Sequence, residues 1–288
     1  MSSKQKGIFF IICSAFSFAL MNLFIRLSGD LPSIQKSFFR NFVALLFAAA
    51  ILLKEKPPFP HSQKAVGHLV LRSMFGTVGI LCNYYAVDHL LLSDASMLNK
   101  MSPFFTIIFA FFLLKEKPNR VQVASICVAF IGVLCIVRPS GLHHMALFPA
   151  LVGLLGGITA GAAYAYVRSL GQQGVKGPLI VFFFSAFSCL VTLPYLLFRY
   201  HPMTGKQLLC LLLAGLAAAG GQFSITAAYC HAPAKEISVY DYSQIPFSAL
   251  LGFLVFQQIP DALSWLGYAI ICSTAIAMFL YTTRHAEN

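Results

Sequence analysis

Charge is scarce in this sequence of 288 residues, and acidic charge is scarcest. Only 10 % of the residues are charged, with nine Asp and Glu against 20 Lys and Arg, whereas soluble domains carry about 25 % charged residues. Hydrophobic residues make up 58 % of the chain, and its mean hydropathy is +0.78. This composition excludes a water-soluble globular protein and indicates a chain embedded in lipid.

Catalytic and nucleotide-binding motifs are also missing. The sequence has no G-x-x-x-x-G-K-[ST] loop for ATP, no H-E-x-x-H zinc motif and no G-x-S-G serine motif. Tyr240-Asp241 is half of an intramembrane aspartyl protease site, but the G-x-G-D partner that would share its proton is absent. We therefore expect no ATP-driven pump and no cofactor, and an intramembrane enzyme without a recognisable motif is only an alternative.

Metal and redox chemistry find little support in the sequence. The eight cysteines form no C-x-x-C pair and all fall inside or at the edges of hydrophobic segments, as expected of small buried hydrophobic residues. The adjacent His143 and His144 have no obvious third ligand. We expect no metal site.

Ten hydrophobic segments fill the chain almost from end to end. A hydrocarbon core of about 30 Å takes about 20 helical residues to cross, and uniformly apolar segments exclude the alternating strands of a barrel. The predicted spans are 7–27, 34–53, 66–87, 94–114, 120–137, 146–168, 178–198, 207–229, 237–256 and 261–282. The predicted fold class is an all-α integral membrane protein with ten transmembrane helices.

Lys and Arg lie mainly on one side of the predicted membrane. Most of them fall on the side of the N-terminus, for example Lys6, Lys56, Arg72 and Lys176. The positive-inside rule then places both termini in the cytoplasm, with the chain in the plasma membrane, most simply a bacterial inner membrane. The net charge of +11 is therefore mostly topogenic, so the expected partner is the lipid bilayer and not nucleic acid.

The two halves of the chain resemble each other. Leu-Leu-Lys-Glu-Lys-Pro (Leu113–Pro118) ends the fourth span, and Val-Phe-Gln-Gln-Ile-Pro (Val255–Pro260) ends the ninth. Each half has five spans, an odd number, so an internal duplication places the second copy upside down. We predict two inverted five-helix repeats, residues 1–142 and 143–288, an arrangement typical of alternating-access carriers.

Several short motifs occur in a specific order along the chain. They are Ser37-Phe38-Phe39-Arg40-Asn41, Asn83-Tyr84-Tyr85-Ala86, Leu91-Leu92-Ser93-Asp94-Ala95, Ser102-Pro103-Phe104 and the Leu-x-x-Glu that ends at Glu116. Together they resemble the drug/metabolite transporter superfamily in its ten-helix EamA branch, over essentially the whole chain. The resemblance implies both termini inside, a central cavity lined by helices 1 to 4 and 6 to 9, and peripheral helices 5 and 10. A homodimer would form through these peripheral helices.

The second half departs from the family pattern at one position. It has Gln258 where the family commonly repeats the glutamate of Glu116. A gate contact by Glu116 would therefore lack its symmetric counterpart. The simpler interpretation of the Leu-Leu-Lys-Glu-Lys-Pro segment is a positive-inside helix end closed by proline.

Charged residues within the predicted spans are the first candidates for a site, because charge in a bilayer is costly. Lys100 lies in the outer half of the fourth span and Asp241 in the inner half of the ninth. On straight helices their backbones are more than about 10 Å apart, which argues against a direct salt bridge. Asp241 could instead bind a cationic group, carry a coupling proton, or pair structurally with Lys235 or Arg168.

Arg40 reaches nearly the depth of Lys100, so we expect two cations to face an outer-half cavity and Asp241 an inner-half one. A carboxylate or phosphate on a substrate is their natural partner; the alternative is that both cations snorkel to headgroups or lock helices together. The predicted substrate-binding residues are Arg40, Lys100, Asn99, Tyr85, Asn83, Asn22, Asp241, Tyr242, Gln222 and Tyr164.

Two prolines interrupt the spans that carry these charges. Pro103 and Pro246 cannot donate the helical hydrogen bonds that would reach the carbonyls of Asn99 and Tyr242, and those carbonyls would be free to bind. The alternative is a kink in which Ser102 or Ser243 satisfies the backbone.

The function we expect is a secondary transporter of a small polar metabolite. Its substrate would bear a carboxylate or phosphate or be zwitterionic and amino-acid-like, and alternating access would be coupled to protons or run as exchange. A drug-type exporter of cationic compounds is the alternative.

Overall fold

The chain folds entirely into helices over the residues that its computed structural model describes, which are 3–56, 59, 62–115, 120–137, 144–231 and 238–284. The elements are α1 (Ser3–Leu27), α2 (Ser33–Glu55), α3 (Gln63–His89), α4 (Leu92–Asn99), α5 (Ser102–Leu114), α6 (Arg120–Val137), α7 (His144–Gln172), α8 (Gly177–Phe198), α9 (Gly205–His231), the 3-10 helix η1 (Ser238–Ser243), α11 (Gln244–Phe256) and α12 (Ala262–Arg284). Glu116, His143 and Lys235 lie outside the described residues.

Each predicted span coincides with one helix or with two consecutive helices. The segment 94–114 is divided between α4 and α5, and 237–256 between η1 and α11. Within the described residues, seven helical segments are long and apolar enough to cross a membrane: Gln5–Leu27, Ser33–Glu55, Gln63–His89, Asp94–Leu114, Leu147–Gln172, Gly177–Phe198 and Gly205–Ala228. The protein therefore crosses a membrane several times.

Large apolar side chains on the surface support this conclusion. Phe112 is 73 % exposed and Phe198 is 86 % exposed. In water such side chains would be an aggregation liability, whereas lipid covers them at no cost. The polar groups of the protein lie inside instead, among them Arg40, Lys100 and Asp241.

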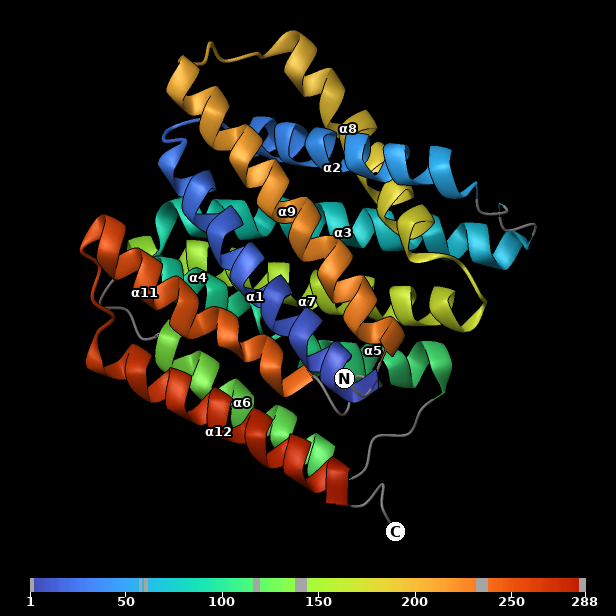
Figure 1. Cartoon of the computed structure of the whole chain (residues 1–288). Helices are drawn as coiled ribbons and strands as arrows, with labels where there is room; N and C mark the ends of the chain where they lie inside the picture. The colour runs from blue at the N-terminus through green and yellow to red at the C-terminus, as the bar shows by residue number, and fades with distance from the viewer. Residues whose placement is uncertain are drawn as a thin grey trace.

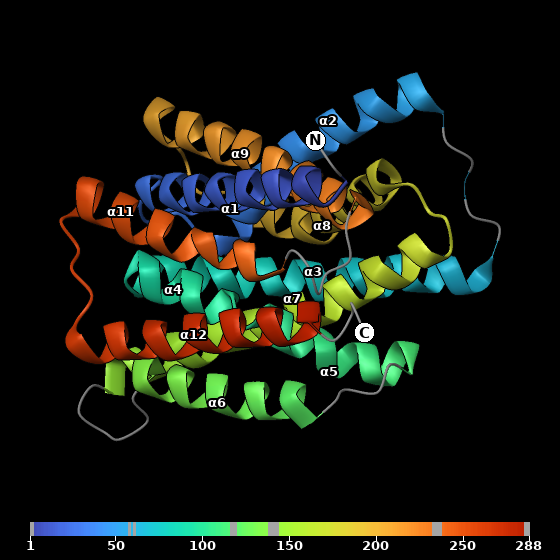
Figure 2. The same cartoon turned by 60° about the horizontal axis from the view of Figure 1, so that its bottom comes forward.

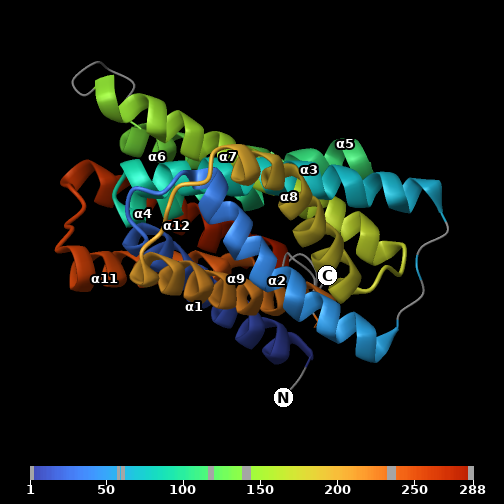
Figure 3. The same cartoon turned by 90° about the horizontal axis from the view of Figure 1, so that it is seen from above.

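The helices pack in pairs that join distant parts of the sequence. α1 lies along α9, and α3 packs against α7 (Figure 1). α6 and α12 run side by side at one edge of the molecule (Figure 2). Seen from above, α2 crosses in front of α8 and α9, which it contacts (Figure 3).

Small residues on α9 allow its neighbours to approach closely. A Cβ added at Gly215 would lie 2.6 Å from Val43 of α2, and one at Gly221 would lie 2.7 Å from the Phe18 ring of α1. The Ser14 hydroxyl also donates to the Gly221 carbonyl across 2.9 Å. These small residues of α9 therefore form a packing ridge, because short side chains allow helix backbones to approach each other in lipid.

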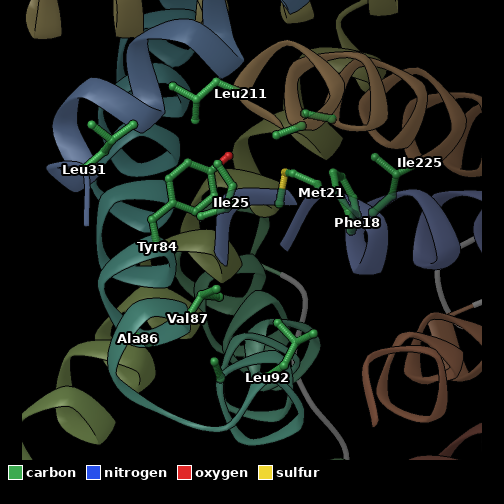
Figure 4. Packing of buried hydrophobic residues seen from close by; sticks show 13 residues of the cluster. Phe18, Met21, Ile25, Leu31, Tyr84, Ala86, Val87, Leu92, Leu211 and Ile225 are labelled. Atoms are coloured by element: carbon green, nitrogen blue, oxygen red, sulfur yellow. The ribbon is translucent and has the colours of Figure 1, made fainter. Parts of the chain in front are cut away.

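A cluster of buried apolar residues connects four of these helices. Figure 4 shows Phe18, Met21 and Ile25 of α1 beside Tyr84 of α3, with Leu92 of α4 nearby. Leu211 and Ile225 of α9 complete the contacts with α1. The cluster holds α1, α3, α4 and α9 in fixed relative positions around the charged interior.

A row of glycines on α7 positions the broken helix α4–α5. Cβ atoms added at Gly157 and Gly161 would lie 2.5 Å from the Leu98 carbonyl oxygen and 2.6 Å from the Phe105 Cβ. The Gly161 carbonyl accepts a hydrogen bond from the Thr106 hydroxyl at 3.2 Å. These glycines therefore let the backbone at the break lie directly on α7.

We predict that Gly157→Ala lowers the free energy of unfolding by about 1–3 kcal/mol, because α7 must move away from the Leu98 carbonyl. Gly171→Ala in the same helix is the matched control, since no atom lies within 4 Å of a Cβ there. Unfolding midpoints of the purified proteins in detergent measure both effects. Equal midpoints for the two variants would contradict the close packing at Gly157.

Candidate functional site

The two proline-containing spans are broken helices, as the prolines predict. α4 ends at Asn99 and α5 begins at Ser102, with Pro103 in its first turn. η1 ends at Ser243, and Pro246 lies in the first turn of α11. Proline suits a first turn because its missing N–H would find no helical partner there.

The broken helices resemble each other in length and ending. α5 and α11 each contain 13 residues. Each is followed by a residue in the left-handed conformation, Lys115 with φ 56° and Gln257 with φ 55°. The similarity of the two halves seen in the sequence thus extends to the backbone at these positions.

Lys100 and Asp241 form a buried ion pair. Lys100 Nζ lies 2.6 Å from Asp241 Oδ2, and both side chains are nearly inaccessible. The prediction that these residues lie too far apart for a direct salt bridge was therefore wrong. Residue depth was calculated along straight helices, but Lys100 follows the last residue of α4 and Asp241 lies in η1, so both belong to the breaks.

The ion pair is the last of three polar contacts between α4 and the α11 segment. The Leu92 N–H donates to Gln258 Oε1 at 3.3 Å, and the Ser96 hydroxyl donates to Ser248 Oγ at 2.8 Å. Leu92, Ser96 and Lys100 are spaced four residues apart and so lie on one face of the helix. We call these three contacts the polar seam.

A small cavity lies beside the ion pair. Its volume is about 70 Å³. Side chains of α1, α2, α3, α7, α8 and α9 line it together with residues from both helix breaks: Phe18, Met21, Asn22, Arg40, Arg72, Gly76, Gly79, Ile80, Asn83, Asn99, Lys100, Ala160, Ala163, Tyr164, Phe184, Gln222 and Gln244. The sequence led us to expect two cavities, one in each half of the membrane. The structure instead brings residues of both predicted sets into one.

Seven of the ten predicted binding residues line this cavity: Asn22, Arg40, Asn83, Asn99, Lys100, Tyr164 and Gln222. The amide of Asn83 donates to Asn22 Oδ1 at 3.1 Å, which joins α3 to α1 at the cavity wall. Their role in binding stays a prediction, but the structure places them together.

Three predicted residues do not line the cavity. Tyr85 stacks on His89, with ring centres 4.1 Å apart, and also contacts Phe148. Tyr242 packs in the apolar core beside Phe104. Asp241 is not part of the lining, but it is paired with Lys100, which is.

Tyr84, next to Tyr85, is the tyrosine that faces the interior. It is fully buried in the apolar cluster (Figure 4). Hydropathy places both tyrosines at one depth but does not give the rotation of α3 about its axis. Only packing decides which of two consecutive residues points inward.

Arg72 is the residue that sequence reasoning missed. It was assigned to the cytoplasmic charges at the helix ends, yet it is 4 % exposed and lines the cavity. The signal was present, because Arg72 lies as far inside its predicted span as Arg40 lies inside the preceding one. The depth argument applied to Arg40 would have identified both.

Arg40 and Arg72 face the same aromatic ring. Their guanidinium carbons lie 5.7 and 4.1 Å from the centre of the Phe184 ring, a cation–π arrangement on α8. Arg40 is 2 % exposed, and its Nη1 donates to Asn41 Oδ1 at 2.6 Å. Within the described residues, the Nε atoms of both arginines have no hydrogen-bond partner.

The cavity thus combines buried cations with polar side chains inside a membrane-spanning helical bundle. Among the described residues, no group of three or more His, Cys, Asp or Glu side chains could hold a metal ion. The fold and the site define a polytopic membrane protein built around a polar, positively charged interior.

Comparisons with known proteins place this architecture in a family. The EamA-like transporter family model matches residues 5–138. The pseudopaline exporter CntI of Pseudomonas aeruginosa is 32 % identical over 95 % of this chain and 96 % of its own length. A riboflavin transporter of Rhizobium johnstonii is 26 % identical over 94 % of this chain and 89 % of its own.

The fold has a counterpart among solved structures. One crystal structure matches with a TM-score of 0.70 over 99 % of both chains, at 15 % sequence identity. At this identity the match shows the fold alone. The sequence relatives carry the assignment: the chain belongs to the EamA-like transporter family of the drug/metabolite transporter superfamily. It is a membrane transporter and not an enzyme.

We predict that Lys100→Met and Asp241→Leu each destabilise the protein by about 3–5 kcal/mol, because either change leaves one buried charge without its partner. The double variant, which carries neither charge, should recover most of that loss. A double-mutant cycle on unfolding in detergent measures the coupling. Additive losses in the double variant would show that the two charges do not depend on each other.

Proposed function

We propose that the protein is a secondary transporter of a small polar metabolite that bears a carboxylate or phosphate, alone or with an amine. The observation that carries this proposal is the pair of buried guanidinium groups, Arg40 and Arg72, at one cavity. Both guanidinium groups lie against the same Phe184 ring. Neither is in an ion pair among the described residues, so an anionic solute would supply the missing charge.

A zwitterionic substrate is included because Asp241 lies beside the same cavity. Its Oδ2 is held by Lys100, while its Oδ1 has no hydrogen-bond partner among the described residues. An amine on the solute could approach this oxygen while the carboxylate meets the arginines. Asn22, Asn83 and Gln222 add donors and acceptors for other polar groups.

The names of relatives support an organic metabolite as the transported solute. One relative is a pseudopaline exporter and another a riboflavin transporter. Both names describe organic solutes rather than inorganic ions. We extend that class to this chain, with the anionic group specified by its own arginines.

We infer an architecture of ten transmembrane helices in two inverted repeats, 1–142 and 143–288. The supporting features are the matched breaks at Pro103 and Pro246 and the equal lengths of α5 and α11. Inverted repeats of this kind place their binding site between broken helices. The orientation we propose has both termini in the cytoplasm, in the plasma membrane of a bacterium, and a homodimer would use the peripheral helices α6 and α12.

The size of the cavity supports a transport mechanism by alternating access. Its volume of about 70 Å³ accommodates only a few water molecules. Sites for small organic ligands measure roughly 300–1,000 Å³. The helices must therefore separate to admit a solute, and we propose that they do so first on one side of the membrane and then on the other.

We expect Arg40→Gln to weaken binding of an anionic solute by roughly 2–5 kcal/mol, because a desolvated charge partner is lost. The solute is first identified by a thermal-stabilisation screen of the purified protein against carboxylates, phosphate esters, amino acids and amines. Counterflow in proteoliposomes then measures transport. Arg199→Gln, a change outside the cavity at the end of α8, is the control.

Unchanged counterflow of an anionic substrate in Arg40→Gln would contradict the proposed function. Selective stabilisation by amines would favour a drug-type exporter of cations.

One variant of Asp241 tests whether this residue couples transport to protons. If Asp241 carries the coupling proton, Asp241→Asn should abolish accumulation driven by a pH gradient while leaving counterflow intact, because exchange needs no net proton movement. Counterflow in the same vesicles is the internal control for folding. Undiminished pH-driven accumulation in the variant would instead make Asp241 a binding residue or a structural partner of Lys100.

A further inference from the structure

The charges around the cavity do not cancel. Its lining contains three cations, Arg40, Arg72 and Lys100. Lys100 is neutralised by Asp241 at 2.6 Å. Among the described residues this leaves two buried positive charges, both guanidinium groups, at a single site.

We propose that the transported solute carries two negative charges, as a phosphate monoester or a dicarboxylate does, and that Arg72 is the residue that selects the second charge. This inference rests on the proposed function and makes it more specific. A solute with one negative charge would leave one buried guanidinium uncompensated, which is costly in a low dielectric. A dianion compensates both at once.

The two arginines differ in how they are held. Arg40 donates to Asn41, whose own amide donates to Ser188 of α8 at 2.7 Å and to the Ser37 carbonyl at 2.9 Å. Arg40 is therefore fixed by a hydrogen-bond network. Arg72 makes no such hydrogen bond among the described residues, and its contact is the face of the Phe184 ring.

Stacking on a ring face positions a guanidinium group without using its donors. An arginine side chain has five N–H donors in a planar fork that fits carboxylate and phosphate oxygens in pairs. The ring offers the Arg72 donors no oxygen acceptor, and Nε has no hydrogen-bond partner among the described residues, so the donors stay available for a solute. This geometry suits a side chain that binds a solute rather than one that forms a structural salt bridge.

Gly76 leaves space for the Arg72 side chain. It lies one helical turn after Arg72 on α3, and a Cβ added there would lie 2.2 Å from Arg72 Nη1 and 2.8 Å from Phe184 Cε2. The Arg72 side chain thus lies along its own helix, in the space left by the absent side chain of Gly76. A methyl group at position 76 would move the guanidinium group away from the ring.

The test compares solutes that differ by one negative charge. Binding to the purified full-length protein is measured by calorimetry for succinate against butyrate, and for phosphate monoesters against their methyl diesters. A phosphate monoester carries close to two negative charges near neutral pH. We expect the best dianion to bind at least tenfold more tightly than its monoanionic counterpart.

Variants assign this preference to Arg72. Arg72→Gln should reduce dianion binding at least tenfold and change monoanion binding much less, so that the preference disappears. Arg72→Lys keeps the charge without the planar fork and should retain a weakened preference. Gly76→Ala should act in the same direction as Arg72→Gln, whereas Gly171→Ala should leave both affinities unchanged.

The outcomes distinguish this inference from the proposed function. Monoanions that bind as tightly as dianions would overturn the inference while leaving an anion transporter in place. Binding of amines alone would overturn both. Failure of every dianion to bind at millimolar concentration would overturn the dianion preference, as would an unchanged preference in Arg72→Gln. If Gly76→Ala does not fold, the comparison of Arg72→Gln with Arg72→Lys decides the question.

Discussion

The ion pair between Lys100 and Asp241 is the interaction on which the arrangement of the interior depends. Either charge alone would be expensive inside a membrane protein. Because both residues lie at helix breaks, their pairing requires α4 and η1 to meet at the level where the two helices are interrupted. The cavity occupies the space next to that meeting point. The helix breaks, the ion pair and the cavity therefore lie together and depend on one another.

The interior contains two kinds of buried charge, those that are neutralised by a partner and those that are not. Lys100 and Asp241 neutralise each other's charge. Arg40 and Arg72 are positioned by a neighbouring amide and by the Phe184 ring, neither of which neutralises them. In the function we propose, affinity for an anion comes from the unneutralised pair, while the neutralised pair joins the two halves of the chain.

The sequence predicted features that depend on local chemistry. Hydropathy located the helices, and proline chemistry located the breaks at Pro103 and Pro246. It could not predict features that depend on rotation and on contacts between distant segments. The orientation of Tyr84 rather than Tyr85, the approach of Lys100 to Asp241 and the merging of two expected cavities into one all require knowledge of how helices turn toward each other. Arg72 was missed for another reason, because a topological rule explained it before its depth was considered.

The polar seam has a mechanical consequence. Its contacts strengthen from the amide hydrogen bond at Leu92, through the hydroxyl pair at Ser96, to the ion pair at Lys100. The Leu92 end is therefore the end that separates most easily, with the ion pair acting as a pivot. The helix rises about 12 Å over the eight steps from Leu92 to Lys100. A rotation of about 20° around the pivot would displace Leu92 by about 4 Å against its apolar cluster without separating the two buried charges.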